Sequence, residues 1–84
     1  MYKNLINNLT KCLVDTLIAI EFSDEKVINK DLAVNLLEQL SAELYQLHKS
    51  DKDVLIEIIF QLSKEYPDKY KQFIQELPDN LGII

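Results

Sequence analysis

The sequence predicts an all-α fold, and three observations carry this prediction. Apolar residues recur every three or four positions along most of the 84-residue chain, which is the spacing of one face of an α-helix. Hydrophobic residues make up 48% of the chain, enough to build a core. One glycine and two prolines leave little material for the tight turns that join strands. We therefore expect residues 1–84 to form a single domain, a compact bundle of four helices with short connections.

The first helix is expected from about Tyr2 to Phe22. Apolar and small side chains at helical spacing predict its core-facing stripe, which comprises Tyr2, Leu5, Ile6, Leu9, Leu13, Thr16 and Ile20. Val14, Ile18 and Phe22 fall on the opposite side, so the C-terminal half of this helix is apolar nearly all round, and the helix is expected to be the central one. The only cysteine, Cys12, flanks the stripe and is expected to be a small buried thiol in a reducing compartment.

The second and third helices are expected to form a pair. Asn29 or Asp31 can accept hydrogen bonds at the start of the second helix, which should end near His48. Ser50 is expected to cap the third helix. The core faces of the two helices are predicted to hold Ala33, Leu36, Leu37, Leu40, Leu44 and Leu47, and then Leu55, Ile58, Ile59, Leu62 and Tyr66. Because the connection is very short, we expect an antiparallel hairpin.

Pro67 favours the start of a fourth helix, since proline suits a first helical turn. This helix is expected over about residues 68–77, with Tyr70, Phe73, Ile74 and Leu77 turned inwards. The segment 78–82 either closes the helix or adds one further turn. Ile83 and Ile84 are expected to pack back onto the core.

The charge balance narrows the choice of partners. Nine lysines and no arginine stand against fourteen acidic residues, for a formal net charge of −5. Nucleic acids and anionic membranes both require clustered cations, so neither is an expected partner. A basic protein suits an acidic surface. The longest apolar stretch, residues 12–22, contains two acids and is too short to span a bilayer, and nothing resembles a signal peptide, so we expect a cytoplasmic protein.

The residues that catalysis requires are not combined in this sequence. None of the carboxylates falls within an apolar stripe that would raise its pKa. His48 is the only imidazole, and with Cys12 as the only thiol there is no zinc-ligand set. Asp51 and Asp53 lack the glycine and the spacing of a calcium loop. We expect no enzyme activity, no cofactor and no catalytic, cofactor-binding or metal-binding residue.

Three groups of residues lie away from the core stripes and are candidates for binding. Val34, Glu38 and Tyr45 line one flank of the second helix, and an exposed tyrosine beside a carboxylate is a common interface anchor. The alternative is that Tyr45 only covers the edge of the core. Ile56 and Phe60 line a flank of the third helix and would mark a partner or a dimer if exposed; alternatively, that helix is buried on two sides.

The third group is an acidic run at the junction of the first two helices. Its members are Glu21, Asp24, Glu25 and Asp31. With Glu38 they would form a continuous negative face for a basic partner. The alternative is an ordinary solvated loop.

Two stretches of the sequence resemble a known group of proteins. Residues 33–44 read Ala-x-x-Leu-Leu-Glu-Gln-Leu-x-Ala-Glu-Leu, and residues 73–82 read Phe-Ile-x-x-Leu-Pro-x-x-Leu-Gly. With the capped third helix between them, they resemble small acidic helical immunity proteins encoded beside toxin genes in contact-dependent growth inhibition and other polymorphic toxin systems. The chain is also similar in size and charge to nuclease colicin immunity proteins. Of their Tyr-Tyr-Pro turn only Tyr66-Pro67 is present, so none of their binding residues is transferred.

The resemblance implies an antitoxin role. The chain would bind and neutralise a cognate bacterial toxin domain, typically a basic nuclease, with carboxylates standing where substrate phosphates go. Tyr45 and its apolar neighbours would then supply the desolvated anchor. The competing hypothesis is a non-catalytic helical adaptor or homodimeric regulatory module, with Ile56 and Phe60 at the dimer seam.

Overall fold

The computed structural model describes residues 2–22 and 29–84, and within these ranges it contains four helices and no strand. The helices are α1 (Lys3–Glu21), α2 (Lys30–Tyr45), α3 (Lys49–Ser63) and α4 (Asp68–Asn80). The predicted all-α, four-helix architecture is confirmed.

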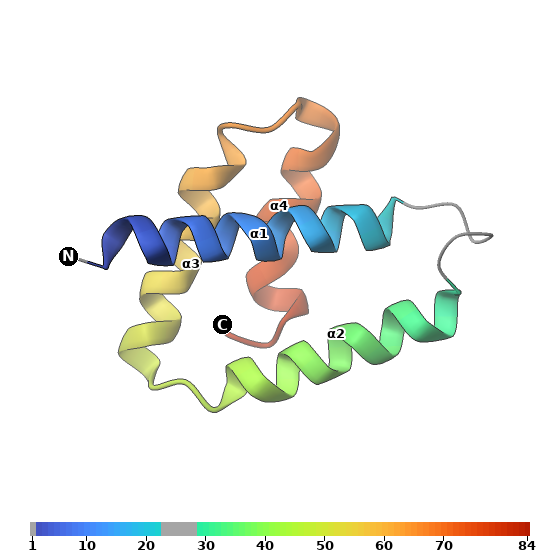
Figure 1. Cartoon of the computed structure of the whole chain (residues 1–84), viewed down its shortest axis with the longest axis horizontal. Coiled ribbons are helices and arrows are strands. Elements are labelled where there is room, and N and C mark those ends of the chain that lie inside the picture. Colours follow the sequence, from blue (N-terminus) through green and yellow to red (C-terminus); the bar gives the residue numbers. More distant parts are fainter. Residues whose placement is uncertain (1, 23–28) are drawn as a thin grey trace.

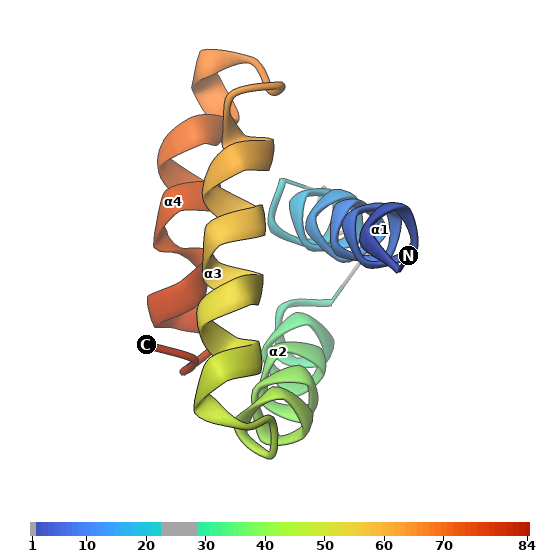
Figure 2. The same ribbon diagram turned by 90° about the vertical axis from the view of Figure 1, so that its left-hand side faces the viewer.

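The helices are arranged in two layers (Figures 1 and 2). The antiparallel pair α3 and α4 forms one layer, and α1 and α2 lie across it in the other. The closest helix packing is between α3 and α4 and between α1 and α3. The predicted hairpin of α2 and α3 is therefore wrong: α3 turns away from α2 and pairs with α4. A short connection brings two helices close at one end only, and side-chain packing decides the angle between them.

The core is built by α1, α3, α4 and the C-terminal segment. Its buried hydrophobic residues are Val14, Leu17, Ile59, Leu62, Ile74, Leu77, Leu81 and Ile83. None of the α2 residues is buried; Leu37, Leu40 and Leu44 pack against the core from its edge. The helix that carries the predicted Tyr45 flank is thus a peripheral element.

The prediction for the core face of α1 is wrong for most of the stripe, although Leu13 does pack against the core. Thr10, Val14 and Leu17 are the buried residues of α1, whereas Leu5 and Leu9 of the predicted stripe are exposed. A helix that is apolar around most of its circumference can present either of two faces to the core, and here α3 and α4 pack against the Val14 side. Cys12, expected to be buried, is exposed for the same reason.

The helix ends differ from the predictions by a few residues. Asn29 caps α2, as expected, by accepting a hydrogen bond of 2.7 Å from the backbone N–H of Asp31. This helix ends at Tyr45 rather than near His48, because its last turn tightens into bonds three residues apart. His48 takes the N-cap position of α3 without a side-chain cap bond, and Ser50 lies inside the helix.

The C-terminal segment closes the core. Helix α4 runs through the buried Pro78 to Asn80. Of the two alternatives for residues 78–82, the structure therefore has the additional helical turn. Gly82 follows with a φ of 71°. The N–H of Gly82 bonds to Asp79 and that of Ile83 to Pro78, both at 3.0 Å, which is a Schellman motif. The resulting reversal buries Ile83, as expected, but leaves Ile84 exposed, contrary to the prediction.

A polar cluster fastens α1 to the turn between α3 and α4. The Tyr66 hydroxyl donates a hydrogen bond to the Asp15 carboxylate and accepts one from the Lys11 ammonium at 3.3 Å. The same ammonium lies 4.7 Å from the centre of the Tyr66 ring. Burial raises the pKa of Tyr66, and the bond to Asp15 raises it further. The bond to Tyr66 raises the pKa of Lys11.

This cluster makes stability sensitive to alkaline pH. Because the pKa values of Tyr66 and Lys11 are raised in the folded state, their contribution is complete at neutral pH and is lost as the pH rises above about 10. We expect the free energy of unfolding to fall more between pH 8 and pH 11 in the wild type than in Tyr66→Phe, as measured by urea unfolding. Tyr2→Phe, at an exposed tyrosine, should lose as much as the wild type. Equal losses in all three proteins would contradict the prediction.

Candidate protein-binding surface

Tyr45 stands at the rim of a hollow where three segments meet. It is the last residue of α2, and 72% of its surface is exposed. The hollow beside it has a volume of about 430 Å³ and is lined by Tyr45, Lys49, Lys52, Asp53, Ile56, Gly82, Ile83 and Ile84. Its walls therefore come from the end of α2, the first two turns of α3 and the C-terminal segment.

Two lysines lie at the hollow beside the exposed tyrosine, Lys49 and Lys52. The Lys52 ammonium lies 4.5 Å from the centre of the Tyr45 ring, a cation–π contact that holds the ring against α3. Lys49 pairs with Asp53 across one turn at 3.4 Å. The surroundings of Tyr45 are thus of mixed charge, whereas the acidic residues in the sequence predict a negative face beside it. The lysines were missed because they belong to the next helix.

The flank of α2 that ends at Tyr45 is exposed to solvent. Val34, Glu38 and Tyr45 are all exposed, so the structure places them on one accessible face of the helix. Of the four acids proposed to extend this face, Glu21 and Asp31 are exposed at the facing ends of α1 and α2. Asp24 and Glu25 lie outside the described residues.

The second predicted patch is divided between two environments. Ile56 is half-buried, packs against the core and lines the Tyr45 hollow. Phe60, one turn further along α3, is 43% exposed. The structure therefore joins Ile56 to Tyr45 as the apolar floor of one hollow. A sequence pattern within single helices could not show this, because the contact depends on how α3 meets the end of α2.

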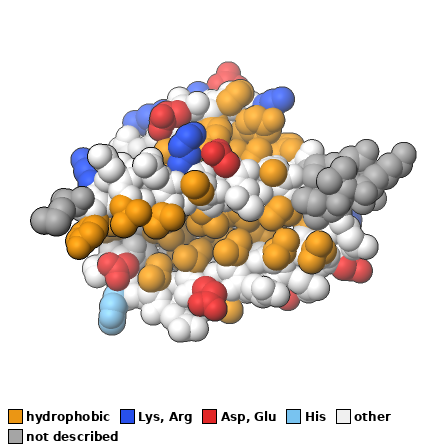
Figure 3. Space-filling model, viewed as in Figure 1, with side chains coloured by type: hydrophobic (Ala, Val, Ile, Leu, Met, Phe, Trp, Pro, Cys, Tyr) orange, Lys and Arg blue, Asp and Glu red, His pale blue; other side chains and the backbone are white. Residues whose placement is uncertain are grey.

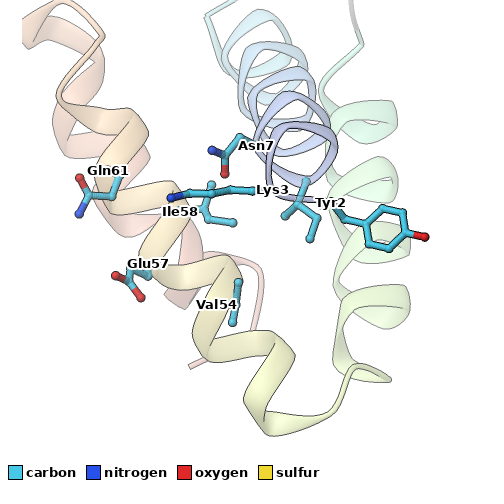
Figure 4. Close-up of a pocket in the computed structure, with 8 residues that line it drawn as sticks. Tyr2, Lys3, Asn7, Val54, Glu57, Ile58 and Gln61 are labelled. Atoms are coloured by element: carbon cyan, nitrogen blue, oxygen red, sulfur yellow. The ribbon is translucent and has the colours of Figure 1, made fainter.

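Two further hollows border α1. One, of about 620 Å³, lies between the start of α1 and the middle of α3 and has a mixed lining that includes Lys3, Asn7, Val54 and Glu57. Figure 4 shows the ring of Tyr2 pointing away from α3 at the edge of this hollow. The other, of about 480 Å³, lies between the end of α1 and the middle of α2, and it is lined by Thr16, Ile20, Leu36, Gln39, Leu40, Ala42 and Glu43.

In residues 2–22 and 29–84, no three or more His, Cys, Asp and Glu side chains are grouped so that they could hold a metal ion. Across those residues, none of the helices has the length and apolar character needed to cross a bilayer.

Fold and surface together define a class: an all-α domain whose exposed features are apolar and tyrosyl surfaces on helices. Comparison of the chain with protein-family models, curated proteins and solved structures finds no match.

Proposed function

We propose that this chain is an immunity protein, which binds and neutralises a cognate bacterial toxin domain in the cytoplasm and has no catalytic activity of its own. The observation that carries the proposal is the exposure of Tyr45 beside an apolar-floored hollow, at the end of an open helix flank. The proposed target is a basic nuclease domain, as expected for the immunity proteins that the sequence resembles.

Tyr45 has the properties of a binding anchor. A tyrosine ring offers a large apolar area with only two rotatable bonds, so ordering it costs little entropy. The Lys52 ammonium over the ring restricts it further before any partner arrives. Ile56 and Ile84 supply apolar surface in the adjoining hollow, which a partner side chain could fill and keep free of water.

Exposed carboxylates near the α2 flank supply the electrostatic attraction to a basic partner. Glu38 lies two helical turns before Tyr45 on α2, and Glu21 and Asp31 are exposed near the start of that helix. With a net charge of −5, the chain attracts a basic domain from a distance and accelerates the encounter. Slow dissociation, which neutralisation requires, would then depend on the packing around Tyr45.

The test is inhibition of a nuclease domain encoded directly upstream of this chain. We expect the wild type to abolish its cleavage of RNA or DNA at equimolar concentration. Tyr45→Ala should weaken the complex at least about 30-fold, because truncation of a central tyrosine removes about 2 kcal/mol or more of binding free energy. The dissociation constant is measured by calorimetry, and residual cleavage by gel assay.

A matched control is Val54→Ala, which shortens an exposed apolar residue of α3 outside the Tyr45 hollow and should bind as the wild type does. Undiminished cleavage in the presence of excess wild-type protein would overturn the proposed function. Equal weakening by both variants would leave no special role for Tyr45.

A homodimeric regulatory module is the second candidate. The predicted seam of Ile56 and Phe60 is small, because Ile56 packs against the core. The exposed apolar residues of α1 offer a larger surface for self-association. They favour a homodimer that forms through α1 and not through α3.

A further inference from the structure

The exposed side of α1 carries a heptad pattern. Starting at Tyr2, positions spaced alternately by three and four residues are Tyr2, Leu5, Leu9, Cys12, Thr16 and Ala19. All six are exposed and none is charged. This spacing averages 3.5 residues per turn, the repeat that keeps one face of a helix in contact with a partner helix. We call these six residues the α1 seam.

The α1 seam has no partner within the described chain. Helix α1 uses Thr10, Val14 and Leu17 to contact the core, and α3 lies on that side. Figure 2 shows α1 at the outer edge of the molecule, with its other side uncovered. In Figure 3, hydrophobic side chains gather in a band along α1 and its junction with α2. Leu9 is 61% exposed, a large unfavourable exposure that a partner helix would relieve.

We propose that the α1 seam is a homodimer interface, in which α1 of one copy packs antiparallel against α1 of a second copy around a twofold axis. The carrying observation is the order of side-chain sizes: the first three seam residues are large and the last three are small. Antiparallel pairing sets Tyr2 against Ala19, Leu5 against Thr16 and Leu9 against Cys12 of the second copy. Every layer then joins one large and one small side chain, as close packing requires.

Parallel pairing would not fit this order. It would set Tyr2 against Tyr2 and Leu9 against Leu9, and then Thr16 against Thr16 and Ala19 against Ala19. The two helices would be forced apart at one end and would leave a void at the other, and both defects are destabilising.

The hollow between α1 and α2 lies where the second copy needs space. Thr16 and Ile20 border it from α1, and Leu36 and Leu40 border it from α2, with a volume of about 480 Å³. In the antiparallel arrangement, Leu5 of the second copy faces Thr16. The large residues at the start of one α1 are thus directed to the apolar hollow at the end of the other.

Charges at the edges of the seam do not oppose this pairing. Each copy carries a net charge of −5, so association requires contact through an uncharged face, and the α1 seam provides one. Beside the seam, antiparallel pairing brings Asp15 opposite Asn8 of the second copy, and Ile6 opposite Leu13. No pair of like charges meets. A carboxylate can instead accept a hydrogen bond from the asparagine amide.

This interface is separate from the proposed toxin-binding surface. Val34, Glu38 and Tyr45 lie on the flank of α2 that does not border the α1–α2 hollow. Dimerisation through α1 would leave that flank open in both copies. Dimerisation through α1 can therefore be tested independently of toxin binding.

Sedimentation equilibrium over a range of protein concentrations tests the interface. We expect a reversible monomer–dimer equilibrium in the wild type, with the dissociation constant raised at least about 100-fold in Leu9→Glu, because the twofold axis introduces the charge twice. Ile84→Glu places the same charge at an exposed apolar residue of the C-terminus, on the side of the molecule away from α1 (Figure 2), and should dimerise as the wild type does. Circular dichroism checks that both variants remain helical. A wild type that stays monomeric at millimolar concentration, or a dimer unaffected by Leu9→Glu, would overturn the proposal.

Disulfide cross-linking tests the direction of the helices. In a Cys12→Ser background, we prepare Leu5→Cys and Thr16→Cys separately, oxidise each alone and then oxidise their mixture. Antiparallel pairing places position 5 opposite position 16, so only the mixture should form a covalent dimer. Covalent dimers in each variant alone, with none between the two, would establish parallel pairing and refute the antiparallel interface.

Discussion

Leu17→Ala is expected to lower the free energy of unfolding by about 3 kcal/mol or more, since it empties a fully enclosed site in the core. Leu17 is 1% exposed and belongs to the core cluster, where it lies with residues of α3 and α4. The total stability expected for a domain of this length is roughly 4 to 12 kcal/mol, so the loss is a large part of it. Urea unfolding followed by circular dichroism measures the change.

Leu9→Ala is the matched control, because it removes the same atoms from the same helix at an exposed position. At concentrations where the chain is monomeric, its effect should be within about 0.5 kcal/mol. Comparing Leu17→Ala with Leu9→Ala distinguishes the observed orientation of α1, with Leu17 inside, from the predicted one, with Leu9 inside. A larger loss in Leu9→Ala than in Leu17→Ala would contradict the orientation described here.

Ile83→Asp is expected to destabilise the fold by about 3 kcal/mol or more, because it places a carboxylate in the apolar core without a partner. Ile83 is 3% exposed and is held inward by the Schellman motif that follows α4. Part of the effect should appear as reduced cooperativity of unfolding, since the segment would be released from the core. Thermal unfolding by calorimetry would record both changes.

The neighbouring residue provides the comparison for that experiment. Ile84 is 80% exposed, so Ile84→Asp should change the free energy of unfolding by no more than about 0.5 kcal/mol. Both variants add the same charge at the same end of the chain, and only the burial differs. Similar losses in the two would show that Ile83 is not part of the core in solution.

The existence of the four helices could be predicted from the sequence, because each contains a long run of apolar residues at helical spacing. Local signals also located some helix ends. Asn29 caps α2 as expected, and Pro67 precedes α4. These features depend on residues within a few positions of one another, which is the range over which a sequence pattern is informative.

Features that depend on contacts between residues far apart in the sequence could not be predicted from local patterns. Around α1, the Leu9 side and the Val14 side are both apolar, and only the arrival of α3 and α4 determines which is buried. The periodicity therefore predicts Tyr2, Leu5, Leu9 and Thr16 on the core face, whereas all four are exposed. The error explains why Cys12 was expected to be inside.

The candidate site shows the same division between local and distant information. The exposed flank of Val34, Glu38 and Tyr45 follows from their angular position on one helix, and the structure leaves all three accessible. The hollow beside Tyr45 requires α3 and the C-terminal segment to converge on the end of α2. No spacing within α2 contains that information.

The absence of buried residues in α2 bears on how this chain can evolve. Substitutions on its outer flank cost little stability, because the core is assembled by the other elements. Under the proposed function, recognition and folding would fall to different parts of the 84-residue chain. A lineage under pressure to follow a changing target could replace the residues of this flank one after another while the molecule continued to fold.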